Sequence, residues 1–225
     1  MLSENKVLTP MLVHKAYRYE LDPNNFQKSS LHQHAGVARF AYNWGLEQRI
    51  NLFKSNKENA RFTDATKQHK LLNSLKKTKY PWMYECSKCA PQEALRDLHR
   101  AFQNFYRGRR KGQKFGFPRF KKKGIRDSFR LYGIIKIHGR KIQLPRIGKI
   151  RIKERRKSYY GGRILSATIR RRANRWFVSI AVEEEISNPK AIKGKVVEVD
   201  LGIKTLATVH CKLHDLGHQS EVLPE

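Results

Sequence analysis

The stretch RGRRKGQKFGFPRFKKKG, residues 107–124, marks the point where the chain changes from a helical to a strand-forming pattern. Before it, apolar residues recur every three or four positions, which is typical of amphipathic helices. After it, short segments carry the apolar and polar alternation of strands. The sequence therefore predicts an α+β fold in which helices and strands occupy separate parts of the chain.

Three helices are predicted before this stretch, preceded by a strand at residues 11–21. The longest covers residues 26–53, where apolar side chains repeat at helical spacing. A second helix is expected to begin after Thr63, a suitable N-cap. The third runs from about Ala90 to Gly108, because a glycine commonly ends a helix.

The part of the chain after residue 124 is predicted to form short, closely spaced strands, a pattern typical of a small barrel. Two further strands are expected at residues 195–200 and near residues 206–210, after a linker at Asn188-Pro189. The strands expected in the barrel are residues 128–132, 134–138, 141–144, 147–152, 163–172 and 175–185.

Positive charge is concentrated in one segment. The chain has 48 Lys and Arg against 19 Asp and Glu, a net charge of +29, and residues 107–175 hold 26 of the basic residues and only two acids. A field of this kind recruits polyanions through counterion release, which favours nucleic acid as the partner. Two alternatives remain, a solvated basic face and a protein that binds ribosomal RNA.

Other locations and partners are less compatible with the sequence. No run of about 18 apolar residues is present, and the basic segment is too rich in strand signals for a membrane-surface helix. The first residues do not form a secretory signal. Three cysteines, an odd number, fit a reducing cytoplasm. We therefore expect a cytoplasmic protein with no membrane partner.

Aromatic residues interleave with the basic residues in the quoted stretch. Phe115, Phe117 and Phe120 could stack on unpaired bases, but the favoured interpretation is that they pin the loop to the barrel of strands expected after it. The basic side chains are predicted to contact phosphates. The candidate residues are Arg107, Arg109, Arg110, Lys111, Lys114, Arg119, Lys121, Lys122 and Lys123.

Two short motifs could hold metal ions. Cys86 and Cys89 have the spacing of half a zinc site, but no second pair follows, so no zinc is expected. Asp200 ends an apolar strand and precedes a glycine turn, the placement of an Mg²⁺-binding carboxylate in ribonuclease-H-like nucleases. One carboxylate cannot build a two-metal site, and an aspartate that caps a turn is the alternative interpretation.

Read in order, several stretches resemble the TnpB, or OrfB, family of bacterial and archaeal insertion-sequence proteins, which are relatives of type V CRISPR effectors. The resemblance covers roughly residues 11–210. The stretches are HKAYRYELDPN, GVARFAYNWGL, KCAPQEALRDLHRAFQNFYR, FGFPRFKKK, LPRIGKIRI and VDLGIKTLATV.

The resemblance implies an architecture. A wedge-like β-barrel is expected from residues 11–24 and 118–187, with a helical recognition insert at residues 25–117. Residues 1–10 form a lead-in, and residues 195–225 correspond to the start of a RuvC nuclease domain. Asp200 matches the first metal-binding aspartate of that domain, with Mg²⁺ as its cofactor.

The resemblance also implies partners. Proteins of this family use a guide RNA from the transposon end and cut DNA beside a short motif, which Lys88 and Gln92 are expected to face. The later Glu and Asp of the metal site are not matched here. We therefore expect a nucleic-acid-binding portion that cannot cleave alone, associated with a bacterial or archaeal nucleoid. A stand-alone RNA- or DNA-binding regulator or repressor derived from such a nuclease is the alternative.

Overall fold

The structure is a computed structural model. It describes residues 11–55, 64–154 and 162–187 with their side chains, and the backbone of residues 197–200, 208–211 and 220–222. The chain forms two compact units. One consists of Leu12–Ile186, and the other combines Met1–Met11 with Ser187–Glu225.

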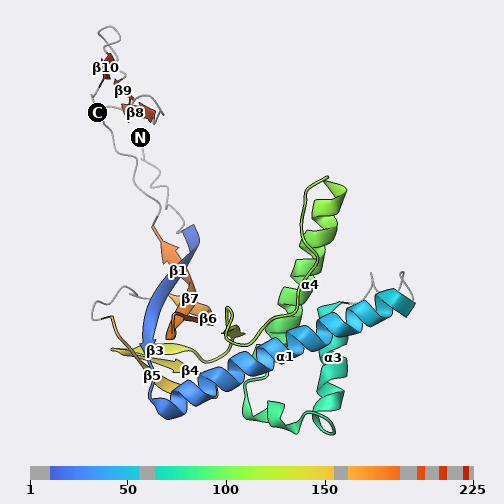
Figure 1. Cartoon of the computed structure of the whole chain (residues 1–225). Coiled ribbons are helices and arrows are strands. Elements are labelled where there is room, and N and C mark those ends of the chain that lie inside the picture. Colours follow the sequence, from blue (N-terminus) through green and yellow to red (C-terminus); the bar gives the residue numbers. More distant parts are fainter. Residues whose placement is uncertain are drawn as a thin grey trace, which may run out of the picture. The chain divides into compact units, whose positions relative to one another are not determined.

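The first unit begins with a strand, continues through helices and returns to strands (Figure 1). This order confirms the predicted α+β class. Its helical elements are α1 (Asn25–Ser55), α3 (Ala65–Lys76), the short 3-10 helix η1 (Pro81–Glu85) and α4 (Cys89–Arg110). Its strands are β1 (Met11–Asp22), β2 (Ser128–Leu131), β3 (Lys136–His138), β4 (Lys141–Leu144), β5 (Gly148–Ile152), β6 (Arg163–Arg172) and β7 (Arg175–Ile186).

Side-chain caps explain where the first two helices begin. Asn24 and Gln27 exchange hydrogen bonds, each side chain accepting from the backbone N–H of the other at 3.1 and 2.9 Å, so they form a capping box at the start of α1. At α3 the cap is Asp64, whose carboxylate accepts from Lys67 N at 2.7 Å. The predicted cap, Thr63, lies outside the described residues.

The predicted end of the third helix was wrong by two residues. Helix α4 continues past Gly108 to Arg110. Gly108 is buried, and a Cβ atom at this position would lie 2.1 Å from Cδ2 of Phe115. The glycine therefore permits the close approach of a neighbouring segment, and it does not terminate the helix.

The seven strands of the first unit form one sheet in the order β2-β6-β7-β1-β5-β4-β3. The predicted barrel was wrong. Among the described residues the sheet is open, and β2 and β3 form its two edges. These edge strands have only four and three residues, and closure would require the two of them to pair with each other.

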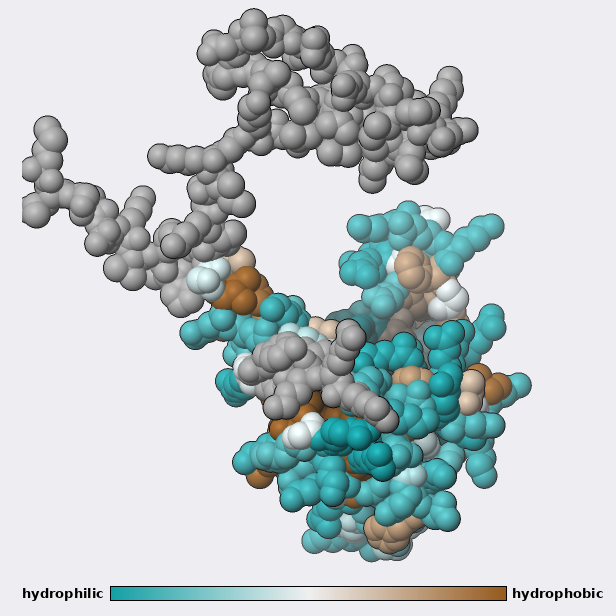
Figure 2. Space-filling model, turned by 90° about the vertical axis from the view of Figure 1, so that its left-hand side faces the viewer, coloured by the Kyte–Doolittle hydropathy of each residue, from teal (hydrophilic) through white to brown (hydrophobic). Residues whose placement is uncertain are grey.

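Alternation along the strands buries one face of the sheet. Ile142 pairs with Ile150, and Ile169 pairs with Val178, and all four side chains are fully buried. Paired β-branched side chains on one face are the unit of sheet stabilisation. The face of the first unit shown in Figure 2 is largely hydrophilic, with small apolar patches.

Helices α1 and α4 cross closely at Gly45. A Cβ atom there would lie 2.6 Å from Cδ2 of Leu95. The side chain of Gln68, on α3, donates to the carbonyl oxygen of Gly45 at 2.8 Å and accepts from Arg49 at 3.0 Å. These contacts join the three helices into one body. None of the described helices is long and apolar enough to cross a bilayer.

The second unit contains a three-stranded antiparallel sheet in the order β10-β9-β8. Strands β8 (Val197–Asp200) and β9 (Thr208–Cys211) were predicted, whereas β10 (Ser220–Val222) was missed. Strand β10 has only three residues, so it is too short for alternation to be recognised.

Candidate nucleic-acid interface

The connection from α4 to β2 runs back beside α4 (Figure 1). It is pinned by aromatic contacts. Phe115 packs on Gly108, and the ring of Phe117 meets those of Phe102 and Phe105 edge-on, at centroid distances of 5.4 and 5.5 Å. Phe115 and Phe117 therefore hold the loop in place, as the favoured interpretation has it, but they pack on helix α4 and not on the strands of the predicted barrel. Both rings nevertheless remain 48% exposed.

A polar clamp holds the connection farther along. The side chain of Asn43, on α1, donates to the carbonyl oxygen of Lys121 at 3.0 Å and accepts from its N–H at 2.8 Å. The Lys121 ammonium lies 4.1 Å from the centre of the Tyr42 ring. Burial lowers the pKa of this ammonium group. Lys121 is therefore turned toward the protein and is a poorer phosphate ligand than its two neighbours.

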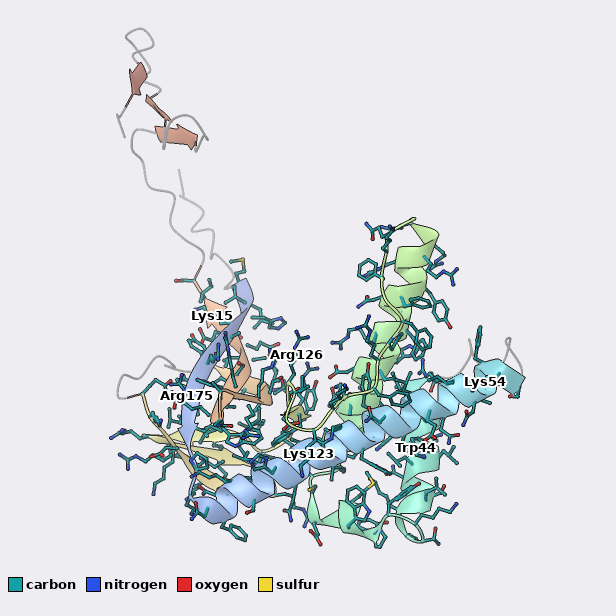
Figure 3. The ribbon with its side chains drawn as sticks, viewed as in Figure 1. Lys15, Trp44, Lys54, Lys123, Arg126 and Arg175 are labelled. Carbon is teal, nitrogen blue, oxygen red and sulfur yellow. The ribbon has the colours of Figure 1, made fainter. Side chains whose placement is uncertain are left out.

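The other predicted basic side chains of this connection, and those of the last turn of α4, are exposed. Figure 3 labels Lys123 on it, together with Arg126, which is also exposed but was not among the predicted site residues. Asp127, the first acid after the stretch, is buried and forms an ion pair with Arg39 at 3.1 Å. The Asp127 carboxylate is therefore neutralised by Arg39 and does not compete for the exposed cations. The exposed predicted residues are Arg107, Arg109, Arg110, Lys111, Lys114, Arg119, Lys122 and Lys123.

Lys88 and Gln92 lie at the opposite end of α4 from the arginines of its last turn. Lys88 is the exposed N-cap of this helix, and Gln92 is half-buried one turn later. A helix of 22 residues is about 33 Å long. The structure thus separates the predicted site residues into two areas.

Lys88 borders a cleft of about 910 Å³. The cleft is formed by α3, η1, the turn between β2 and β3, and the turn between β4 and β5.

His34 fixes the turn that carries Lys88. Its Nε2 atom accepts a hydrogen bond from Ser87 N at 3.0 Å, and its Nδ1 atom donates to the carbonyl oxygen of Ser30 at 2.8 Å. This pair of bonds requires the neutral ring. The side chain is 1% exposed, and burial lowers the pKa of the imidazole. His34 therefore ties α1 to the start of α4.

We expect acid to destabilise the fold through His34. Because its folded pKa is lowered, its contribution is fully present above about pH 6.5 and is lost as pH falls below that value, by at most about 1.4 kcal/mol per pH unit. The measurement is the free energy of unfolding in urea between pH 8 and 5. His34→Gln should give a shallower pH dependence than the parent chain. Equal slopes would contradict this role of His34.

Cys86 and Cys89 have different surroundings. Cys86 is buried, and burial raises the pKa of its thiol to about 11, which disfavours the thiolate that binds metals. The Sγ atom of Cys89 lies 3.8 Å from the carbonyl oxygen of Tyr132. In the described part of the chain, no three His, Cys, Asp or Glu residues are grouped so that they could hold a metal ion.

Asp200 is the last residue of β8, where its backbone pairs with Thr208 of β9. Its position at a strand end agrees with the sequence prediction. The side chain lies outside what the structure describes. Glu198, two residues earlier on the same strand, pairs with His210.

Comparison with known proteins shows which protein family this chain is similar to. Residues 11–58 match the family HTH_OrfB_IS605, described as a helix-turn-helix domain. InsQ, a candidate RNA-guided DNA endonuclease of Escherichia coli K12, is 31% identical over 199 residues, which span 87% of this chain and 47% of InsQ. The chain belongs to the TnpB/OrfB family. Within the matched stretch of this TnpB/OrfB chain, the described residues form β1 and α1.

Other relatives match to a similar extent. Rv2885c of Mycobacterium tuberculosis H37Rv, named in the same way as InsQ, is 30% identical over 221 residues, covering 87% of this chain and 48% of the relative. The TnpB/OrfB chain thus spans about half the length of these curated relatives and corresponds to their N-terminal half. A solved Cas12f1–sgRNA–target DNA complex aligns with 92% of the chain and 56% of its own, at 12% identity and a TM-score of 0.38.

Proposed function

We propose that this chain is the nucleic-acid-binding N-terminal portion of an RNA-guided DNA endonuclease, and that it binds guide RNA from the transposon end and target DNA. One observation carries the proposal. The connection after α4 presents a run of exposed cations on a backbone held by Phe117 and Asn43. Cations on a fixed backbone suit a polyphosphate, because little conformational entropy is lost on binding.

The two ends of α4 suggest a division of roles. The basic end suits an RNA backbone, which is recognised largely through phosphates and shape. The other end carries Lys88 and Gln92, which are ordinary readers of base edges in the major groove. We infer that residues 25–117 form the recognition insert, of which the end with Lys88 and Gln92 faces the target DNA. Residues 11–24 and 118–187 would then be the wedge domain.

We further propose that residues 195–225 begin a RuvC domain and that Asp200 is its first Mg²⁺ ligand. When bound, Mg²⁺ would stabilise charge on the reacting phosphate. A hard divalent ion needs several oxygen ligands, and two such ions repel each other unless several carboxylates surround them. Asp200 matches only one of the family's carboxylates. The 225-residue chain by itself should therefore not cleave DNA.

Gln92 provides a test of sequence reading. With the RNA-loaded chain and DNA duplexes that vary in the flanking base pairs, Gln92→Ala should relax discrimination at one base pair by about 1–3 kcal/mol. Gln103, exposed farther along α4, offers a matched control, and Gln103→Ala should keep the parent's ranking. An unchanged ranking in Gln92→Ala would show that this residue reads no base.

A further inference from the structure

A second cleft, of about 730 Å³, lies between the end of α1, the second half of α4 and the connection that returns beside it. Figure 3 labels Lys54, the neighbour of Phe53, at this end of α1. Five aromatic rings and three arginines line the cleft, and none of its described lining residues is acidic. Its volume is within the range of small-ligand sites.

The aromatic rings of the cleft differ in what they contact. Phe117 is held edge-on by Phe102 and Phe105, at interplanar angles of 87° and 85°. Phe53 comes from α1, is 49% exposed and has no ring partner among the described residues. A large, half-exposed ring on a cleft wall is suited to stack on a flat partner.

The arginines of the cleft supply positive charge that could bind an anion. The guanidinium of Arg109 lies 5.8 Å from the centre of the Phe105 ring, and Arg110 follows it at the end of α4, with both side chains exposed. A planar group that carries an adjacent anion would satisfy the rings and the cations together. A nucleotide provides both in one unit. A second copy of this chain does not, since it carries a net charge of +29.

We propose that this cleft takes one unpaired nucleobase of a bound strand, with Phe53 stacking on the base and Arg109 and Arg110 holding a flanking phosphate. The inference rests on the proposed function, because it assumes that the chain binds nucleic acid. It adds a site for a single unpaired base. RNA and DNA share this chemistry, and the experiment distinguishes them.

The test uses the 225-residue chain and two RNA hairpins that differ by one bulged 2-aminopurine, with the same pair made in DNA. The bulged hairpin of one of the two nucleic acids should bind about 10-fold more tightly than its paired form, with quenched 2-aminopurine fluorescence. Phe53→Ala should abolish this preference and Phe53→Trp should retain it. Phe26→Ala, at the other end of α1 and 78% exposed, is the matched control and should behave like the parent.

Four results would overturn the proposed base-binding site. Equal binding of bulged and paired hairpins by the parent would do so, while salt-sensitive binding of the paired hairpin would leave the proposed function standing. Equal effects of Phe53→Ala and Phe26→Ala would remove the assignment to this cleft. A parent dimer that Phe53→Ala converts to a monomer would show a second copy in the cleft. If the parent binds none of the hairpins, the proposed function fails as well.

Discussion

Replacing Lys122 and Lys123 with alanine is expected to weaken the binding of structured RNA by about 10- to 100-fold at moderate salt. Both side chains are exposed on the connection after α4, whereas Lys121 is held against Tyr42. Each lost phosphate contact should also lower the slope of log affinity against log salt by about 0.9 on a duplex. The measurement is a fluorescence titration at several salt concentrations.

A second double variant separates a local contact from the effect of net charge. Lys28 and Lys70 are exposed lysines outside the basic segment, and alanine at both removes the same charge. This variant should keep a slope within about 0.5 of the parent's. If both double variants weaken binding equally, the RNA senses only the overall charge and the connection is not the interface.

Replacing Glu93 with alanine is expected to cost about 2–3 kcal/mol of stability, because it removes the only buried carboxylate of α4 and takes from the half-buried Arg130 its ion-pair partner. Glu93 is 3% exposed. Its carboxylate accepts from Arg96 at 2.6 Å and from the Tyr132 hydroxyl at 3.3 Å, and it lies 3.6 Å from the Arg130 guanidinium on β2. It therefore joins α4 to the sheet.

The measurement for Glu93 is the midpoint of urea unfolding. Asp97, on the same helix and 41% exposed in its side chain, pairs with Arg100 at 3.7 Å and is the matched control. Asp97→Ala should cost less than about 0.5 kcal/mol, as exposed pairs do. Similar midpoints for the two variants would mean that the Glu93 pairs contribute no more than surface pairs.

The helices and most strands could be predicted because each depends on local pattern. Strands β4 and β6 were predicted with the bounds that the structure has, since turn residues flank them closely. Helix α1 follows the periodicity of its buried side chains. The barrel was predicted where the structure has an open sheet, because closure depends on hydrogen bonds between strands that are far apart in the sequence and leave no local pattern.

Site residues were harder to rank from the sequence. Lys121, Lys122 and Lys123 look alike in the sequence, and only the tertiary contacts of Asn43 and Tyr42 turn the first of them inward. Gly108 resembles a helix terminator, yet its role is to receive Phe115. No local pattern indicates such contacts, because the residues involved come from different elements.

The most direct test of the central claim is to sequence the RNA that copurifies with the full 225-residue chain, expressed together with the DNA that flanks its gene. If the chain is the RNA-binding portion of an RNA-guided endonuclease, transcripts of the transposon end should be enriched about 10-fold or more over total RNA, and Lys122→Ala with Lys123→Ala should reduce that enrichment. RNA whose composition matches the cellular pool, dominated by ribosomal RNA, would contradict the account and favour a general RNA-binding protein.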